Sequence, residues 1–276
     1  MFKATSALCL RLTGRLTLAI LCCTLLAGFA RAQDSIPDGQ LDVPYVPTPP
    51  EVVELMLQMA QVQPDDYLID LGSGDGRIVI AAAKDYGVKQ ALGVDLDPQR
   101  IEEAEENARA AKVEDRVRFE QGDLFEQDLS EATVLTMYLL SSVNMQLRPV
   151  ILETLEPGTR VVSHAFNMGD WQPDRHEQVN YASVYLWIVP AKVDGTWQLN
   201  TERGEELLLD LDQQFQEFEG TARLGKEEMS VTAGQLNGRE IRFTLNNEEY
   251  VGRVEDDRMI AVAGPDTAQG WQARRL

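Results

Sequence analysis

The strongest constraint on the fold is a short apolar segment that leads straight into a glycine-rich turn, between Tyr67 and Gly76. The turn also contains Gly72 and Gly74, so three glycines fall within five residues. Glycine tolerates positive φ, and the missing Cβ lets a ligand approach backbone amides. Residues 77–86 continue with an alanine-rich helical pattern. The sequence therefore predicts a strand, a ligand-binding loop and a helix in succession.

Acidic residues around this loop indicate the charge of the ligand. Asp70 and Asp75 would repel a pyrophosphate, and the third glycine arrives one residue too early for the dinucleotide pattern G-x-G-x-x-G. A second predicted strand ends at Asp95, and a third is followed by Asp123. Carboxylates at successive ends of parallel strands lie at one edge of the sheet. They suit a cationic ligand with ribose hydroxyls and an adenine amino group, such as S-adenosylmethionine.

Strand and helix patterns alternate up to about residue 190, which is typical of a mostly parallel sheet with helices on both faces. The first helix is expected to start with a capping box, in which Thr48 caps and Glu51 reaches back to the cap amide. We expect helices over 48–61, 76–86, 98–112 and 142–155, and strands over 67–71, 91–95, 116–120, 132–138 and 160–166.

The pattern changes to a period of two from Gly195 onward. Ile241, Phe243 and Leu245 alternate with polar residues, and turn signals such as Asn237-Gly238 separate the apolar runs. This spacing predicts a small antiparallel sandwich or open barrel without a catalytic constellation. Its aromatic residues are expected to form the core; they are Phe215, Phe218, Phe243, Tyr250 and Trp271.

The first 32 residues contain four bases and no acid, and residues 16–30 form an uncharged, mostly apolar run. A small-x-small sequence ends at Ala32, so this segment is predicted to be a secretory signal and the protein to be exported or periplasmic. An uncleaved membrane anchor or an organellar presequence is the alternative. After cleavage we expect no stable membrane span and no cysteine, with His164 and His176 as the two histidines. No metal site is therefore expected.

The chain has 45 acidic and 25 basic residues, a net charge of −20. Nucleic-acid binding depends on clustered lysine and arginine, so a nucleic-acid partner is not expected. A basic protein surface is a better match for this charge, and solubility alone is the alternative explanation of it.

Four motifs together give the chain a family resemblance. They are residues 47–50 (PTPP), 70–77 (DLGSGDGR), 132–140 with Asn144, and 157–164 (PGTRVVSH). Over residues 44–190 the chain resembles the class I S-adenosylmethionine-dependent methyltransferases. Within these it resembles prokaryotic relatives of the mitochondrial protein-lysine methyltransferases that modify the ATP synthase c-subunit and the adenine nucleotide translocase. A more distant likeness runs to the non-SET histone-lysine methyltransferases.

The resemblance implies a Rossmann-like seven-stranded α/β sheet that ends in an antiparallel hairpin, here 177–180 and 182–189. The domains would be a signal peptide (1–32), a lead-in (33–47), a methyltransferase domain (48–191) and a small all-β domain (195–276). The implied activity is N-methylation of a protein lysine. Two alternatives stay open: methylation of a small molecule, and a non-catalytic exported binding module, because S-adenosylmethionine is made in the cytosol.

The resemblance also implies a set of site residues. Asp70 would lie near the methionine ammonium, Asp95 would accept from the ribose hydroxyls, and Asp123 would accept from the adenine. The full cofactor set is Tyr45, Thr48, Asp70, Gly72, Ser73, Gly74, Asp95, Asp123 and Leu124. Tyr138, which faces the reactive methyl, and Asn144 are the implied catalytic residues. His164 and Trp171 are candidates for the wall of the acceptor pocket.

Overall fold

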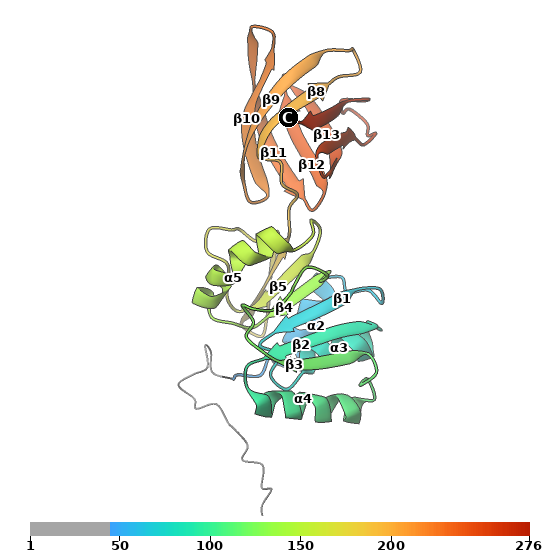
Figure 1. The fold of residues 1–276 in the computed structure, drawn as a ribbon, viewed down its shortest axis with the longest axis vertical. Helices are drawn as coiled ribbons and strands as arrows, with labels where there is room; N and C mark the ends of the chain where they lie inside the picture. Colours follow the sequence, from blue (N-terminus) through green and yellow to red (C-terminus); the bar gives the residue numbers. More distant parts are fainter. Residues whose placement is uncertain (1–44) are drawn as a thin grey trace, which may run out of the picture. The chain divides into compact units, whose positions relative to one another are not determined.

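The computed structural model describes residues 45–276 (Figure 1). The predicted signal segment, 1–32, and the lead-in as far as residue 44 lie outside the described residues, so the export prediction stays a prediction. Within 45–276, no helix has the length and apolar character needed to cross a membrane.

The first part of the chain forms a seven-stranded mixed sheet in the order β3-β2-β1-β4-β5-β7-β6. Strands β1 to β5 run parallel, whereas β7 runs antiparallel to both β5 and β6. This confirms the predicted Rossmann-like sheet with a terminal hairpin. The strands are β1 (Tyr67–Leu71), β2 (Gln90–Asp95), β3 (Val117–Gln121), β4 (Val134–Met137), β5 (Arg160–His164), β6 (Arg175–Val179) and β7 (Ala182–Ile188).

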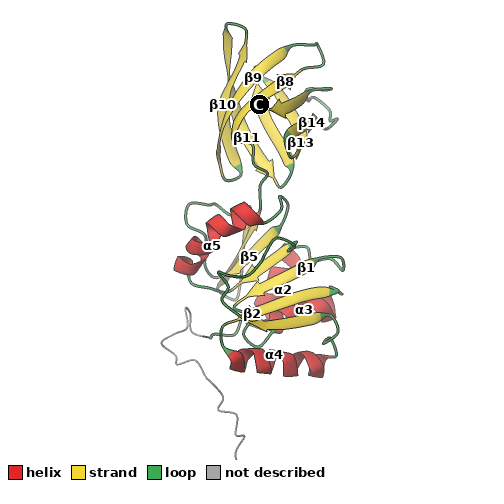
Figure 2. Ribbon diagram, in the orientation of Figure 1, coloured by secondary structure: helices red, strands yellow, loops and turns green. Residues whose placement is uncertain are grey.

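Helices cover both faces of this sheet (Figure 2). In β1, Leu68 packs into the core formed with three of the helices, while its neighbours Ile69 and Leu71 pack into the core formed with the fourth. Successive side chains of a strand point to opposite faces, so β1, with apolar residues at successive positions, is buried on both. The first three helices are α2 (Pro50–Met59), α3 (Arg77–Asp85) and α4 (Pro98–Ala111), and the fourth is α5 (Ser141–Thr154).

The first helix starts differently from the expected capping box. Helix α2 begins at Pro50, its N-cap residue is Pro49, and no side chain caps it. Thr48 Oγ1 lies 3.2 Å from His164 Nδ1 instead, and the Glu51 carboxylate accepts a bond from Asn180. Both residues of the predicted capping pair are thus used for contacts with the distant β5 and β6–β7 segments. Tertiary partners outweigh the local pattern here.

The C-terminal part forms a closed eight-stranded barrel, not a sandwich or an open barrel. The barrel closes because β8 pairs with both β9 and the last strand, β15. Four of the five predicted core aromatics are buried inside it, whereas Phe215 stacks on Trp171 of the sheet region. The strands are β8 (Gly195–Asn200), β9 (Glu206–Gln214), β10 (Glu217–Leu224), β11 (Glu227–Asn237), β12 (Glu240–Leu245), β13 (Glu248–Glu255), β14 (Arg258–Ala261) and β15 (Gln272–Arg275).

Candidate active site

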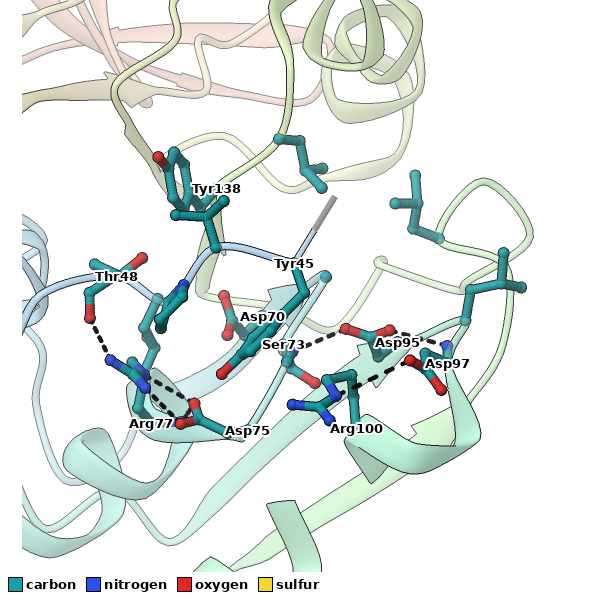
Figure 3. Close-up of a pocket in the computed structure, with 18 residues that line it drawn as sticks. Tyr45, Thr48, Asp70, Ser73, Asp75, Arg77, Asp95, Asp97, Arg100 and Tyr138 are labelled. Carbon is teal, nitrogen blue, oxygen red and sulfur yellow. Dashed lines mark hydrogen bonds and ion pairs between the residues drawn. The ribbon is translucent and has the colours of Figure 1, made fainter. Parts of the chain in front are cut away.

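A pocket lies at the carboxyl ends of β1, β2 and β4 and is covered by the segment before α2 (Figure 3). Nine of the eleven residues named from the sequence line it; they are Tyr45, Thr48, Asp70, Gly72, Ser73, Gly74, Asp95, Leu124 and Tyr138. The other two, Asp123 and Asn144, do not. Nine further residues line the pocket and were not predicted as site residues; they are Val46, Pro47, Asp75, Arg77, Ile78, Leu96, Asp97, Arg100 and Leu139.

The glycine loop shapes this pocket through close packing. The amide of Gly72 donates to Val94 O at 2.8 Å, and the amide of Gly74 donates to Asp95 Oδ2 at 2.8 Å. These amides are bonded within the protein, so the expected exposure of N–H groups to a ligand is not what the glycines provide. Gly74 has a φ of +54°, and a Cβ there would lie 2.5 Å from Tyr45 Cε2. Glycine therefore allows both the turn and the approach of the tyrosine ring.

Asp70, the last residue but one of β1, is a buried carboxylate in the pocket wall. It is 2 % exposed, and the Thr136 hydroxyl donates to its Oδ1 at 2.7 Å. Burial raises the pKa of Asp70 to about 7, despite this hydrogen bond. A neutral hydroxyl does not balance a buried negative charge, so Asp70 is ready to pair with a cationic group.

Asp95 ends β2 and serves as an anchor for the surrounding backbone. Its two carboxylate oxygens accept from the amides of Gly74 and Asp97, at 2.8 and 3.0 Å. Burial raises its pKa, and the two amides oppose that change. The next acid along the sheet edge, Asp123, is exposed and accepts from the Phe125 amide at 2.9 Å. The structure thus places Asp123 beyond the pocket lining.

Two arginines hold the segment before α2 over the pocket (Figure 3). Arg77 donates to the backbone oxygen of Thr48 at 2.8 Å and forms an ion pair with Asp75. The Arg100 guanidinium lies 4.6 Å from the centre of the Tyr45 ring. Arg77 is part of the DGR sequence after the glycines, which is the signal that could have identified it. Arg100 carries no comparable signal in the sequence.

Next to the end of β4, the pocket is bordered by an aromatic cluster. Tyr138 follows β4 and lines the pocket, and its ring centre lies 3.8 Å from that of His164 at the end of β5. Phe166 lies next to Tyr138, with ring centres 6.1 Å apart. Burial lowers the pKa of His164 to about 4, so the imidazole is neutral at neutral pH. We call Tyr138, His164 and Phe166 the aromatic wall.

Asn144 supports this wall from behind. Its side chain is fully buried and donates to Ser163 Oγ at 3.2 Å and to the backbone oxygen of Phe166 at 3.1 Å. Between these two partners, Ala165 has a φ of +65°, which is unfavourable for a residue with a Cβ. Asn144 thus secures a strained turn and does not contact the pocket.

Trp171 does not form part of the wall either. The indole is completely buried, and its N–H donates to the side-chain oxygen of Gln216 at 2.9 Å. Trp171 is therefore a packing residue, whereas His164, the other candidate, does contact Tyr138. Among residues 45–276 we found no cluster of three or more histidine, cysteine or acidic side chains suited to hold a metal ion.

Comparison with known proteins identifies related chains. Residues 70–175 match the family model described as ANTKMT methyltransferase domain. A protein-lysine N-methyltransferase of Saccharolobus islandicus is 48% identical over 151 residues, which are 53% of this chain and 94% of the relative. The mouse adenine nucleotide translocase lysine N-methyltransferase is 35% identical over 49% of this chain and 58% of the relative.

A solved structure is similar over the same region. It is an RNA methyltransferase from Salinibacter ruber in complex with S-adenosyl-L-homocysteine, 53% identical in sequence, with a TM-score of 0.53. The match covers 54% of this chain and 96% of that one. The chain is thus an enzyme with S-adenosylmethionine as its cofactor. The residues present fit this cofactor, because the buried Asp70 lacks a balancing charge and the methionine part carries an ammonium. The chain belongs to the class I S-adenosylmethionine-dependent methyltransferases, in the family of the ANTKMT methyltransferase domain.

Proposed function

We propose that this methyltransferase transfers the methyl group to the side-chain amine of a lysine in a protein. The observation that carries the proposal is the aromatic wall beside the cofactor pocket. Tyr138 lines the pocket and is backed by His164, whose low pKa keeps it uncharged. A neutral aromatic surface favours the neutral form of an amine, which is the form that can attack a methyl group. The names of the archaeal and mouse relatives, both lysine methyltransferases, support the same acceptor.

The residues divide the cofactor between them by charge and shape. We infer that Asp70 holds the methionine ammonium, that Asp95 accepts from the ribose hydroxyls, and that Leu124 and Asp123 lie toward the adenine. Gly72, Ser73 and Gly74 provide the close backbone surface, and Tyr45 and Thr48 cover it. When bound, S-adenosylmethionine supplies a methyl group on a positively charged sulfur.

The protein's contribution to the reaction is mainly positioning and exclusion of water. A free lysine amine has a pKa of about 10.4 and must lose a proton to the solvent before it reacts. The aromatic wall lowers the pKa of this amine, so that a larger fraction of it is neutral, and orients it. Held by Asp70, Asp95 and the glycine loop, the cofactor would supply its methyl group to the neutral amine nitrogen and would leave as S-adenosylhomocysteine. We infer that the Tyr138 hydroxyl accepts a hydrogen bond from the attacking amine.

An RNA acceptor is the second candidate, because the related Salinibacter structure is named an RNA methyltransferase. The charges of this chain favour a protein. The net charge is −20, and the two pocket arginines are engaged with acids, Arg77 with Asp75 and Arg100 with Glu103. RNA backbones are held chiefly by available lysine and arginine side chains. A small-molecule acceptor, the other alternative, has no feature of the described residues in its favour.

The proposal is tested with the purified protein, S-adenosylmethionine carrying a trideuterated methyl group, and an extract of the native host cells. The extract is divided into protein, RNA and small-molecule fractions, and each fraction is analysed by mass spectrometry. We expect trideuteromethyl-lysine in one or a few proteins. The Asp70→Asn variant, which should bind the cofactor much more weakly, is the control for methylation by other enzymes. Label confined to nuclease-sensitive material or to metabolites would contradict the proposal.

A further inference from the structure

The β6–β7 hairpin ends in an unusual turn. Val179 pairs with Ala182, so Asn180 and Tyr181 form a two-residue connection, and both have positive φ, +48° and +68°. Such turns favour glycine, asparagine or aspartate at both positions. Asn180 follows this preference, whereas Tyr181 is a bulky residue in a backbone conformation that disfavours it. The Tyr181 side chain is also completely exposed, at 103 %.

Another hairpin and another aromatic residue show how unusual this is. The β12–β13 turn has the same length and also has positive φ at both positions, +51° and +63°, and it uses Asn246 and Asn247. Phe215 also has positive φ, but its ring stacks on buried Trp171 with the centres 5.9 Å apart. Packing therefore compensates for the conformation of Phe215. An exposed ring provides no such compensation, and a strained residue kept without a packing role points to function.

The turn lies on the same side as the aromatic wall, which we call the acceptor side of the pocket. Val184 of β7 pairs with His164, the last residue of β5, so Tyr181 extends past the carboxyl end of β5. The preceding Asn180 donates to the Glu51 carboxylate at 2.8 Å, close in sequence to Thr48, which contacts His164. Tyr181 is thus linked through the start of α2 to the aromatic wall.

The surroundings of the turn define the partner. Glu51 is exposed, and hydrogen bonds from its own backbone amide and from Asn180 lower its pKa, so it carries a negative charge next to the turn. An aromatic face next to a carboxylate attracts lysine and arginine side chains. We infer that Tyr181 is a contact residue for the acceptor protein and lays its ring against the basic segment that carries the target lysine. This inference rests on the proposed protein-lysine activity.

The test uses the acceptor protein identified in the extract experiment and the full-length enzyme. In Tyr181→Gly, the turn receives the residue it favours, and the contact surface is lost. We expect the melting temperature to rise by roughly 1–3 °C while KM for the acceptor rises by about threefold to tenfold, with unchanged affinity for S-adenosylmethionine. In Tyr181→Phe, the aromatic face is kept, and KM should stay within about twofold of the wild-type value.

Asn247→Gly is the matched control, because it puts glycine at the same position of the equivalent turn in the barrel. It should leave the acceptor KM unchanged. If Tyr181→Gly keeps the wild-type KM, or if Asn247→Gly raises it as much, Tyr181 is not an acceptor contact. A wild-type enzyme that methylates no protein at all would instead refute the proposed function, and the inference with it. The two failures are therefore distinguished by the wild-type reaction alone.

Discussion

Burial shifts a pKa on each side of the pocket, but it acts on an acid on one side and on a base on the other. On the cofactor side, burial raises the pKa of Asp70 to about 7 and leaves a carboxylate that requires a cation or a proton. On the acceptor side, burial lowers the pKa of His164 to about 4 and leaves a neutral imidazole against Tyr138. One side is thus prepared for a positive charge, and the other is prepared for a neutral group.

This difference separates binding from reaction. A cationic cofactor binds most tightly next to a buried acid without a balancing charge, whereas a lysine must become neutral before it attacks. If the comparison is correct, substitutions on the cofactor side change affinity, and substitutions on the acceptor side change turnover. The following predictions are ordered by the size of the expected effect.

The largest effect should come from Asp70→Asn. The variant keeps the shape of the side chain and its bond from Thr136 but loses the charge that we propose holds the ammonium. A charge-assisted hydrogen bond contributes about 1.5–3 kcal/mol, so we expect S-adenosylmethionine to bind about 10- to 150-fold more weakly in calorimetry. Asp128 is an exposed acid that accepts from the amide of Ser130. Asp128→Asn is the control and should leave the affinity unchanged.

The same variant should be more stable than the wild-type protein without cofactor. The folded-state pKa of Asp70 is raised above 3.8, so its contribution to stability is fully present below about pH 4 and is lost as the pH rises through 7. At pH 8 the ionised carboxylate destabilises the fold, by an amount on the order of 1–4 kcal/mol. A thermal melt at pH 8 that shows Asp70→Asn to be less stable would contradict this account of the pocket.

The second effect is on turnover and concerns Asn144. In Asn144→Ala, the strained turn at Ala165 loses its support, and His164 and Phe166 are no longer held against Tyr138. We expect kcat to fall about 10- to 100-fold while cofactor affinity stays within about twofold, because misplacing reacting groups by about an ångström has a large cost. Ser163→Ala removes the bond from Asn144 and the bond to the backbone oxygen of Phe166 but keeps the bond from Asn144 to that oxygen, so it should show a smaller loss in the same direction. Equal losses of affinity and turnover would mean that the two sides are not separable.

Much of the cofactor side was predictable from the sequence because it is local. The strand, the three glycines and the acid Asp70 lie within ten consecutive residues, and their order alone indicates the loop. Asp95 could be placed because alternating strands and helices bring successive strand ends to one edge. The closed form of the barrel could not be predicted in the same way, since it depends on β8 meeting β15, more than seventy residues further along the chain.

The acceptor side depends on contacts between distant residues, and there the sequence was less informative. Thr48 fits the pattern of a helix cap, and the structure uses its hydroxyl for His164, 116 residues away. Asn144 was expected to be a catalytic residue beside Tyr138, and its amide instead bonds to the turn after β5. A polar side chain in the sequence shows what it can donate, but its partner is set by packing.

The third prediction concerns the pH dependence of cofactor affinity. Binding of the ammonium needs ionised Asp70, so affinity should fall as the pH drops below about 7 and the carboxylate takes up a proton. Between pH 7.5 and pH 6 the dissociation constant should rise about eightfold. Calorimetry in buffers of different ionisation enthalpy should also detect proton release on binding near pH 7. The Asp70→Asn variant should lose this dependence, and a wild-type affinity that is constant over the range would assign the ammonium to another group.

The smallest effect should come from Tyr138→Phe. The ring stays stacked on His164, so the aromatic wall is kept and only the hydroxyl that orients the amine is lost. A neutral hydrogen bond contributes about 0.5–1.5 kcal/mol, so kcat should fall about two- to twelvefold with unchanged affinity for S-adenosylmethionine. Tyr185→Phe is a suitable control, since that tyrosine stacks on His176 away from the pocket lining. If Tyr138→Phe weakens cofactor binding and leaves kcat intact, Tyr138 belongs to the cofactor side, and the division of the pocket proposed here is wrong.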